Sequence, residues 1–134
     1  MVLANKKHGM NNFRSVTPML WTDKLAETLE FYKHTLGFTV NEFSEEWGWA
    51  DISRDNVNLM LARPNEHETF NTGAKFTGSF YIRVDNADDL WEKLKEKTKV
   101  CYPIENFDWG MREFAIYDNN GYILQFGHEI SDQK

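Results

Sequence analysis

Two short segments of the sequence carry large aromatic or thioether side chains followed by a carboxylate. They are Trp47, Trp49 and Asp51 and, 62 positions further on, Trp109, Met111 and Glu113. Aromatic faces stack on planar molecules and attract cations, and a nearby carboxylate adds ion pairing. Residues of these types at this spacing favour a flat or cationic organic ligand, and the formal net charge of −6 points the same way.

The spacing of 62 residues also relates other parts of the chain, which indicates an internal repeat. Residues 17–23 align with 79–85, and residues 46–49 align with 108–111. Asp23 coincides with Asp85, and a Trp-Gly pair recurs in the second alignment. A period of this length predicts one supersecondary unit used twice. The alignment then makes Asp51 and Glu113 counterparts on equivalent strands.

Hydrophobic periodicity predicts the same order of elements in both copies. In the first copy we expect a strand at 14–22, a helix at 23–36 and strands at 38–43, 47–53 and 57–63. In the second we expect a strand at 79–85, a helix at 87–97 and strands at 99–105, 109–117 and 122–128. Asp23 is the expected cap of the first helix, and Gly37 is its expected end. Residues 54–56 and 118–121 are expected as turns, with Asp118 and Asn119 serving as turn-formers.

A chain of 134 residues is long enough for one domain with its own core. We expect a flexible leader at 1–13, a single domain at 14–128 and a tail at 129–134. Within the domain, module one is 14–63, a connecting loop is 64–78 and module two is 79–128. The part of the loop from 64 to 77 is a candidate lid.

Strand alternation divides the predicted sheets into two faces, because successive side chains of a strand point to opposite sides. One face is almost purely apolar and is the predicted core, with Pro18, Leu20, Leu59, Leu61, Phe80, Ile82, Val84, Leu124 and Phe126. The other face mixes aromatic, thioether and polar side chains and is the predicted cavity, with Thr17, Met19, Trp21, Asn58, Met60, Ser79, Tyr81, Arg83 and Gln125.

The composition argues against several classes of partner. Acidic residues outnumber Lys and Arg, which disfavours nucleic-acid binding. No apolar stretch reaches the roughly 18 residues of a membrane span, so we expect no membrane partner. The single Cys101 cannot form a disulfide within the chain, which is compatible with a reducing compartment and a cytoplasmic location.

The order of elements and two motifs resemble the vicinal oxygen chelate superfamily, which includes glyoxalase, extradiol dioxygenases, fosfomycin-resistance enzymes and bleomycin-resistance proteins. The first motif is Leu-Ala-Glu-Thr-Leu-Glu-Phe-Tyr at residues 25–32, followed by Leu36-Gly37-Phe38. The second is Tyr-Asp-Asn-Asn-Gly-Tyr-Ile-Leu at residues 117–124. The resemblance covers about residues 14–128. It implies an α+β fold of two tandem βαβββ modules whose curved mixed sheets surround a cavity, and it implies a homodimer.

The same resemblance implies where a divalent metal is held in the family's enzymes. Those positions fall at Thr17, Met60, Ser79 and Gln125, where His or Glu is expected. A hydroxyl pair, a thioether and an amide are poor ligands for such ions. We therefore expect no metal, no other cofactor and no catalytic residue.

These observations favour metal-independent binding and sequestration of a small aromatic or cationic organic molecule, as in the bleomycin-resistance branch. The expected ligand-binding residues are Met19, Trp21, Trp47, Trp49, Asp51, Met60, Tyr81, Arg83, Trp109, Met111, Glu113 and Gln125. One alternative is an enzyme, a metal-dependent glyoxalase-type lyase or extradiol dioxygenase whose ligands lie elsewhere. Another is a structural dimer or a partner-binding module.

Several of these residues also have a simpler interpretation. Trp47 and Trp109 are alternatively anchors of a dimer interface. The two carboxylates are alternatively solvated, or are ion-pair partners of Arg83 and Arg112, and a role as acid and base lacks any accompanying nucleophile or electrophile. The methionines of the cavity face are alternatively gap-filling residues. The role of Arg83 stays open, because it suits either a carboxylate neighbour or an anionic ligand.

Overall fold

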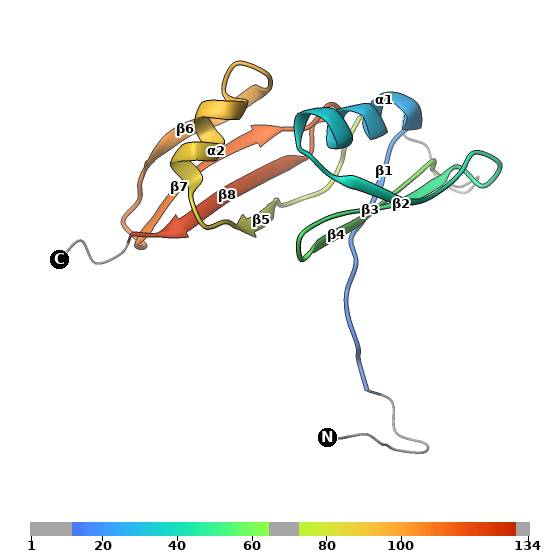
Figure 1. The fold of residues 1–134 in the computed structure, drawn as a ribbon, viewed down its shortest axis with the longest axis horizontal. Helices are drawn as coiled ribbons and strands as arrows, with labels where there is room; N and C mark the ends of the chain where they lie inside the picture. The colour runs from blue at the N-terminus through green and yellow to red at the C-terminus, as the bar shows by residue number, and fades with distance from the viewer. Residues whose placement is uncertain (1–11, 65–72, 131–134) are drawn as a thin grey trace.

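Each half of the chain forms a four-stranded mixed sheet with one helical segment, as the computed structural model shows for residues 12–64 and 73–130 (Figure 1). The strand order is β1-β4-β3-β2 in the first sheet and β5-β8-β7-β6 in the second. The outer pairs β1–β4 and β5–β8 are parallel, and the other neighbours are antiparallel. The predicted α+β class and the tandem βαβββ order are therefore confirmed.

The elements of module one are β1 (Met19–Trp21), α1 (Leu25–Glu30), η1 (Phe31–Thr35), β2 (Thr39–Ser44), β3 (Trp49–Arg54) and β4 (Val57–Ala62). Those of module two are β5 (Phe80–Arg83), α2 (Ala87–Leu94), β6 (Lys99–Asn106), β7 (Met111–Tyr117) and β8 (Ile123–Glu129). Most of the predicted leader, connecting loop and tail, including the candidate lid, lies outside the described residues.

The first helix differs from its prediction at the start and in its last turn. Asp23 does not cap it, because the N-cap is Lys24, whose amide donates to the hydroxyl of Thr22 at 3.1 Å. The helix continues as a π-helical turn, η1, before Gly37 turns the chain with φ 75°. That positive φ favours glycine, so the predicted C-terminal role of Gly37 is confirmed.

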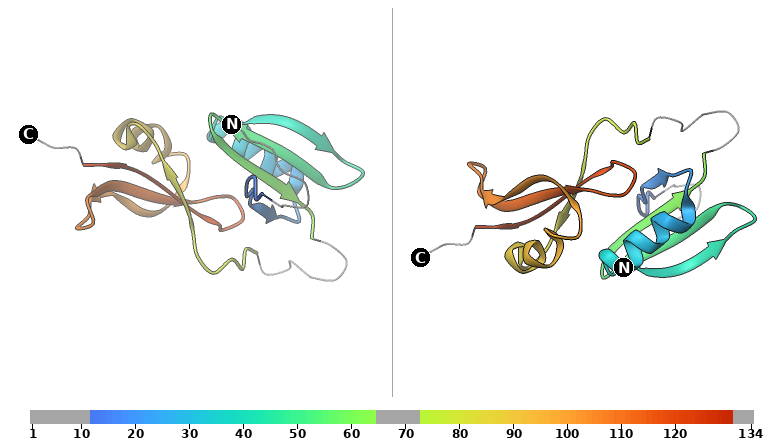
Figure 2. Two further views of the ribbon diagram at one scale, coloured as in Figure 1. Left: turned by 90° about the horizontal axis from the view of Figure 1, so that it is seen from below. Right: turned by 90° about the horizontal axis from the view of Figure 1, so that it is seen from above.

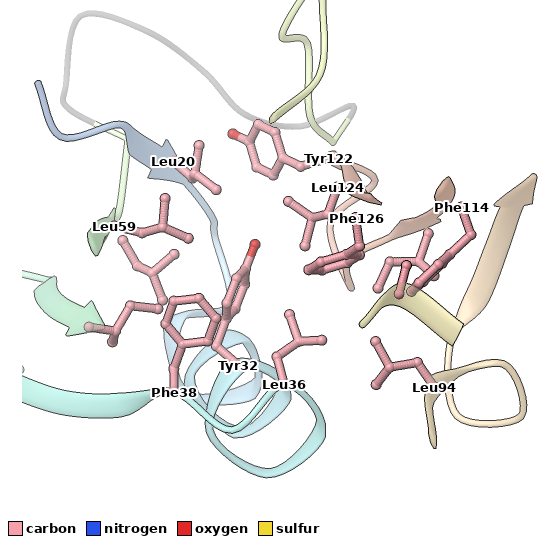
Figure 3. Close-up of a cluster of buried hydrophobic side chains, with 14 of the residues drawn as sticks. Leu20, Tyr32, Leu36, Phe38, Leu59, Leu94, Phe114, Tyr122, Leu124 and Phe126 are labelled. Carbon is pink, nitrogen blue, oxygen red and sulfur yellow. The ribbon is translucent and has the colours of Figure 1, made fainter. Parts of the chain in front are cut away.

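The core lies between the helices and the sheets and runs through both modules (Figure 3). Tyr32 from η1 makes edge-on contact with Phe38, and Phe114 from β7 stacks against Phe126 from β8. The predicted core face is confirmed for most of its members. Leu20, Leu59, Leu61, Leu124 and Phe126 are buried, and Phe80, Ile82 and Val84 pack against them in part.

Both helices lie on the same side of the two sheets, so each sheet has one face that no helix covers (Figures 1 and 2). Seen from one side the helices lie in front of the strands, and seen from the other the strands lie in front (Figure 2). The two sheets sit side by side rather than face to face. Their uncovered surfaces, called here the helix-free faces, carry the side chains predicted for the cavity.

The turn between β7 and β8 joins module two to module one. The hydroxyl of Tyr32 donates to Oδ2 of Asp118 at 2.7 Å. The hydroxyl of Tyr122 accepts from the amide of Trp21 and donates to its carbonyl, both at 3.0 Å. Asp118, expected only to form a turn, and Tyr122, expected in the following strand, therefore fix the contact between the modules, which we call the inter-module clasp.

Within the described residues, no helix is both long enough and apolar enough to cross a membrane.

Candidate functional site

A buried carboxylate lies at the centre of the helix-free face of module two. Glu113 on β7 is 1% exposed. Its Oε1 accepts hydrogen bonds from the hydroxyl of Tyr81 at 2.7 Å and from Nε1 of Trp109 at 3.2 Å. Its Oε2 accepts from the hydroxyl of Tyr102 at 2.6 Å. Donors from β5, from β6 and from the β6–β7 turn thus converge on one charge.

A second layer of polar contacts holds these donors. Nε2 of Gln125 donates to the hydroxyl of Tyr102 at 2.8 Å and approaches Oε2 of Glu113 at 3.5 Å. The hydroxyl of Ser79 donates to Oε1 of Gln125 at 2.5 Å. The resulting network links β5, β6, β7 and β8. We call Tyr81, Tyr102, Trp109, Glu113 and Gln125 the Glu113 cluster.

The network keeps the central carboxyl ionised. Burial acts to raise the pKa of Glu113, but hydrogen bonds from Tyr102, Tyr81, Trp109 and Gln125 outweigh burial and hold that pKa below its usual value. Burial, and then the hydrogen bond to Glu113, raise the pKa of Tyr102 to about 12. The same two causes raise the pKa of Tyr81. Both phenols therefore remain protonated donors at neutral pH.

Aromatic rings surround this charge and reach the surface. Phe107 stacks on Trp109 with ring centroids 4.8 Å apart and meets Tyr102 edge-on at 5.5 Å. Trp109 is 65% exposed and Tyr81 is 41% exposed, so both present ring surface to solvent. The arrangement suits a ligand that packs against aromatic rings and is attracted by the negative charge of Glu113.

Gly127 on β8 makes room for the cluster. A Cβ built at this position would overlap the hydroxyl of Tyr81 and lie 2.9 Å from Cβ of Glu113. The φ angle of Gly127 is not positive, so glycine is required here because a side chain would not fit. The missing side chain lets Tyr81 reach across the sheet to Glu113.

Replacing Gly127 by alanine is expected to lower the free energy of unfolding by about 1–3 kcal/mol, because the added methyl group overpacks this contact. Chemical denaturation measures the loss. In a Tyr81→Ala background the same methyl group should cost less, since one of its two clashes is gone. An equal cost in both backgrounds would contradict this account of Gly127.

The helix-free face of module one is built differently. Asp51 on β3 is partly exposed and accepts from Nδ2 of Asn58 at 2.8 Å and from Nδ2 of Asn41 at 3.3 Å. Amides rather than phenols therefore surround this carboxylate. Asp51 lies in one row of the sheet with Met60 and Met19.

The strand pairings correct the expected equivalence of Asp51 and Glu113. Asp51 lies in the row of the module-one sheet that begins at Met19, whereas the matching row of module two begins at Tyr81 and reaches Ala115 on β7. Glu113 lies instead in the row that matches Trp49. The constant shift of 62 residues is therefore wrong for these strands, and the two carboxylates are not counterparts.

The other expected site residues form no hydrogen bond with the carboxylate of Glu113 within the described part of the chain. Trp47 is 79% exposed in the β2–β3 turn, and Met111 is buried near the start of β7. Trp21 and Trp49 share one row of module one, with Ala62 between them. Arg83 pairs loosely with Glu129, its Nη1 lying 3.8 Å from Oε2.

The alternative interpretation, in which Asp51 and Glu113 form ion pairs with Arg83 and Arg112, is not what the structure shows. Arg83 is engaged with Glu129, and Nη2 of Arg112 lies 2.8 Å from Oδ1 of Asp88. Arg83 also lines a cleft of about 460 Å³ that opens between the modules. Leu36, Phe38, Leu90 and Leu94 are among the apolar residues of that cleft, and no member of the Glu113 cluster lines it.

Sequence reasoning missed Tyr102 and Phe107. Tyr102 lies on β6, where the pairing with β7 shifts register on both sides of it, so alternation does not place its side chain. The unusual density of aromatic residues around Trp109 was the one available signal for Phe107.

The four positions expected for a metal do not fit a hard divalent ion. The hydroxyl of Thr17 donates to Oδ1 of Asn58, and that of Ser79 donates to Gln125. With Met60 they supply hydroxyl, amide and thioether groups only. Over residues 12–64 and 73–130, no group of three or more His, Cys, Asp or Glu side chains is placed to hold a metal.

Comparison with known proteins gives one family and many similar folds. The sequence model of the Glyoxalase/Bleomycin resistance protein/Dioxygenase superfamily matches residues 14–126. No protein of curated function shows significant sequence similarity.

Solved structures resemble this fold at low sequence identity. A bleomycin-binding protein from Streptomyces verticillus, crystallised with copper(II)-bleomycin, is 24% identical with a TM-score of 0.64, over 87% of this chain and 97% of that one. Lactoylglutathione lyase from Agrobacterium tumefaciens is 18% identical with a TM-score of 0.69, over 88% and 96%. TioX from Micromonospora sp. ML1 is 16% identical with a TM-score of 0.69, over 90% and 100%. At these identities the likeness extends to the fold alone.

Proposed function

Because the chain belongs to the Glyoxalase/Bleomycin resistance protein/Dioxygenase superfamily, we propose that it binds and sequesters a small aromatic or cationic organic molecule without a metal ion. One observation carries the proposal, namely that a buried, ionised carboxylate lies among exposed aromatic rings on a helix-free face. The name of the bleomycin-binding relative agrees with this function, although that name describes the relative.

The alternative from the sequence is a metal-dependent lyase or dioxygenase, and lactoylglutathione lyase is among the proteins of similar fold. The donor set gives this alternative little support, since Thr17, Met60, Ser79 and Gln125 offer no carboxylate or imidazole. The phenols of Tyr81 and Tyr102 are also poor candidates for general acid–base catalysis at neutral pH, because the pKa of each is raised.

A homodimer is part of the proposal. The helix-free faces carry several large exposed side chains, and exposed apolar residues gathered on one surface are typical of interaction sites. They are Met19, Tyr81 and Trp109, and Trp47 is exposed in the β2–β3 turn. A second copy placed over these faces encloses a ligand that one chain leaves open to solvent. A cytoplasmic location is also proposed, on the ground that Cys101 can make no disulfide within the chain.

A thermal-shift screen of cationic and aromatic compounds, with metal-free bleomycin included, tests the proposal. A compound that binds only the folded state raises Tm, and at 100 times Kd the stabilisation is about 2.7 kcal/mol. We expect at least one compound to raise Tm equally with and without a chelator such as EDTA. Loss of every such shift in EDTA, or a stoichiometric metal in protein purified without added metal, would contradict metal-independent binding.

A further inference from the structure

We propose that the Glu113 cluster receives a quaternary ammonium group, so that module two binds the positively charged end of the ligand. The inference deepens the proposed function and rests on it. It starts from two properties of Glu113. Its negative charge has no cationic partner among the described residues, yet its carboxylate oxygens already accept most of the hydrogen bonds that they can form.

The charge of Glu113 is solvated but not neutralised. Its donors are two phenols, an indole and an amide, all of them neutral groups. Among the residues that the structure describes, no Lys, Arg or His forms an ion pair with it, and the nearby Arg83 and Arg112 pair with Glu129 and Asp88. A buried negative charge without a cationic partner attracts a cationic ligand more strongly than an exposed one, because the local dielectric is low.

The hydrogen bonds of Glu113 select the kind of cation. Oε1 accepts two donors, and Oε2 accepts one close donor and one distant donor. A primary ammonium or a guanidinium needs acceptors for its N–H groups when it leaves water, and this carboxylate has few to offer. A quaternary ammonium has no N–H group, so it requires only a nearby negative charge and aromatic surface.

The rings around Glu113 provide that surface in a fixed arrangement. Hydrogen bonds to the carboxylate orient Tyr81, Tyr102 and Trp109, and Phe107 packs between Tyr102 and Trp109. Rings held in place before binding lose little conformational freedom when a ligand arrives. Module one lacks this combination, since amides surround Asp51.

The experiment compares three small probes by isothermal titration and by tryptophan fluorescence. Choline carries a quaternary ammonium, 3,3-dimethylbutan-1-ol is its neutral carbon isostere, and ethanolamine carries a primary ammonium. We expect the wild-type protein to bind choline at least about tenfold more tightly than either of the other two. Equal affinities for the three, or no binding of choline at concentrations up to about 100 mM, would overturn the inference.

Two variants of the cluster and one control variant test the origin of the preference. Glu113→Gln should remove the preference for choline over its isostere, while Asp85→Asn, which removes an exposed charge outside the cluster, should retain it. Tyr81→Phe frees one acceptor position on Oε1, so binding of ethanolamine should improve relative to choline. Near-ultraviolet circular dichroism confirms that each variant is folded. A preference that persists in Glu113→Gln, or that is unchanged in Tyr81→Phe, would contradict the assignment.

These outcomes separate the inference from the proposed function. If uncharged aromatic compounds raise Tm in the thermal-shift screen but choline does not bind, the binding function stands and the ammonium site is wrong. If choline raises Tm and binds with the expected preference but no aromatic compound raises Tm, the ammonium site stands and aromatic recognition is wrong.

Discussion

Replacement of Asp118 by alanine is expected to lower the free energy of unfolding by about 3–5 kcal/mol, since it strips three buried or part-buried donors of their acceptor. Asp118 is buried, and it accepts from the hydroxyl of Tyr32 and from the amides of Asn120 and Tyr122 at 2.7–2.9 Å. Tyr32 is fully buried, so water does not replace the lost partner. Denaturant unfolding followed by circular dichroism measures the effect.

The source of this loss can be separated from a general effect of removing an acid. Asp85→Ala, at an exposed position of module two, should change stability by less than about 0.5 kcal/mol. Tyr32→Phe removes the donor instead of the acceptor, and its effect should not add to that of Asp118→Ala, because both break the same hydrogen bond. Fully additive effects would show that this bond does not join the modules.

Replacement of Trp47 by serine is expected to raise the dissociation constant of the proposed homodimer by about 30-fold or more. A tryptophan that is buried only on association is a common hot spot, and about 2 kcal/mol corresponds to this factor. Trp47 is 79% exposed, yet its indole is far too large and apolar to gain from exposure. Sedimentation velocity over a range of protein concentrations measures the change.

An exposed residue on α2 supplies the control for this prediction. Glu92 is exposed on α2, which covers the other face of its sheet (Figure 1). Glu92→Ala should leave the dissociation constant unchanged. A wild-type protein that sediments as a monomer at every concentration would remove the homodimer from the proposal, and an unaffected dimer in Trp47→Ser would place its contact elsewhere.

The two faces of each sheet follow from the sequence because side-chain direction in a strand has a period of exactly two residues. Leu59 and Leu61 are buried on β4, while Met60 between them lies on the helix-free face. No knowledge of tertiary structure is needed for this division. It also placed Tyr81 and Gln125 on the helix-free face, where they contribute to the Glu113 cluster.

The sequence did not predict which residues of the two modules are counterparts, because the hairpins of the two modules differ in length. The β2–β3 hairpin closes at the pair Ser44–Trp49, whereas the β6–β7 hairpin continues past the equivalent row to Asn106 and Arg112. A single alignment shift cannot represent such a change. The repeat therefore predicted the architecture correctly but paired Glu113 with Asp51.

The role of Asp118 illustrates a different limit. Asp-Asn-Asn-Gly is a strong turn sequence, and the turn is present. Its packing against η1 depends on how the two modules meet, which no local pattern specifies. A buried carboxylate and an ordinary turn aspartate have the same sequence signal.

The hydroxyl of Tyr122 also protects the backbone of β1. This strand is at the edge of its sheet, and Trp21 directs its amide and carbonyl away from β4. Unpaired backbone groups on such an edge invite pairing with strands of other molecules and, from there, aggregation. Tyr122 occupies both groups with one hydroxyl, so module two protects the edge strand of module one against unwanted β-sheet extension.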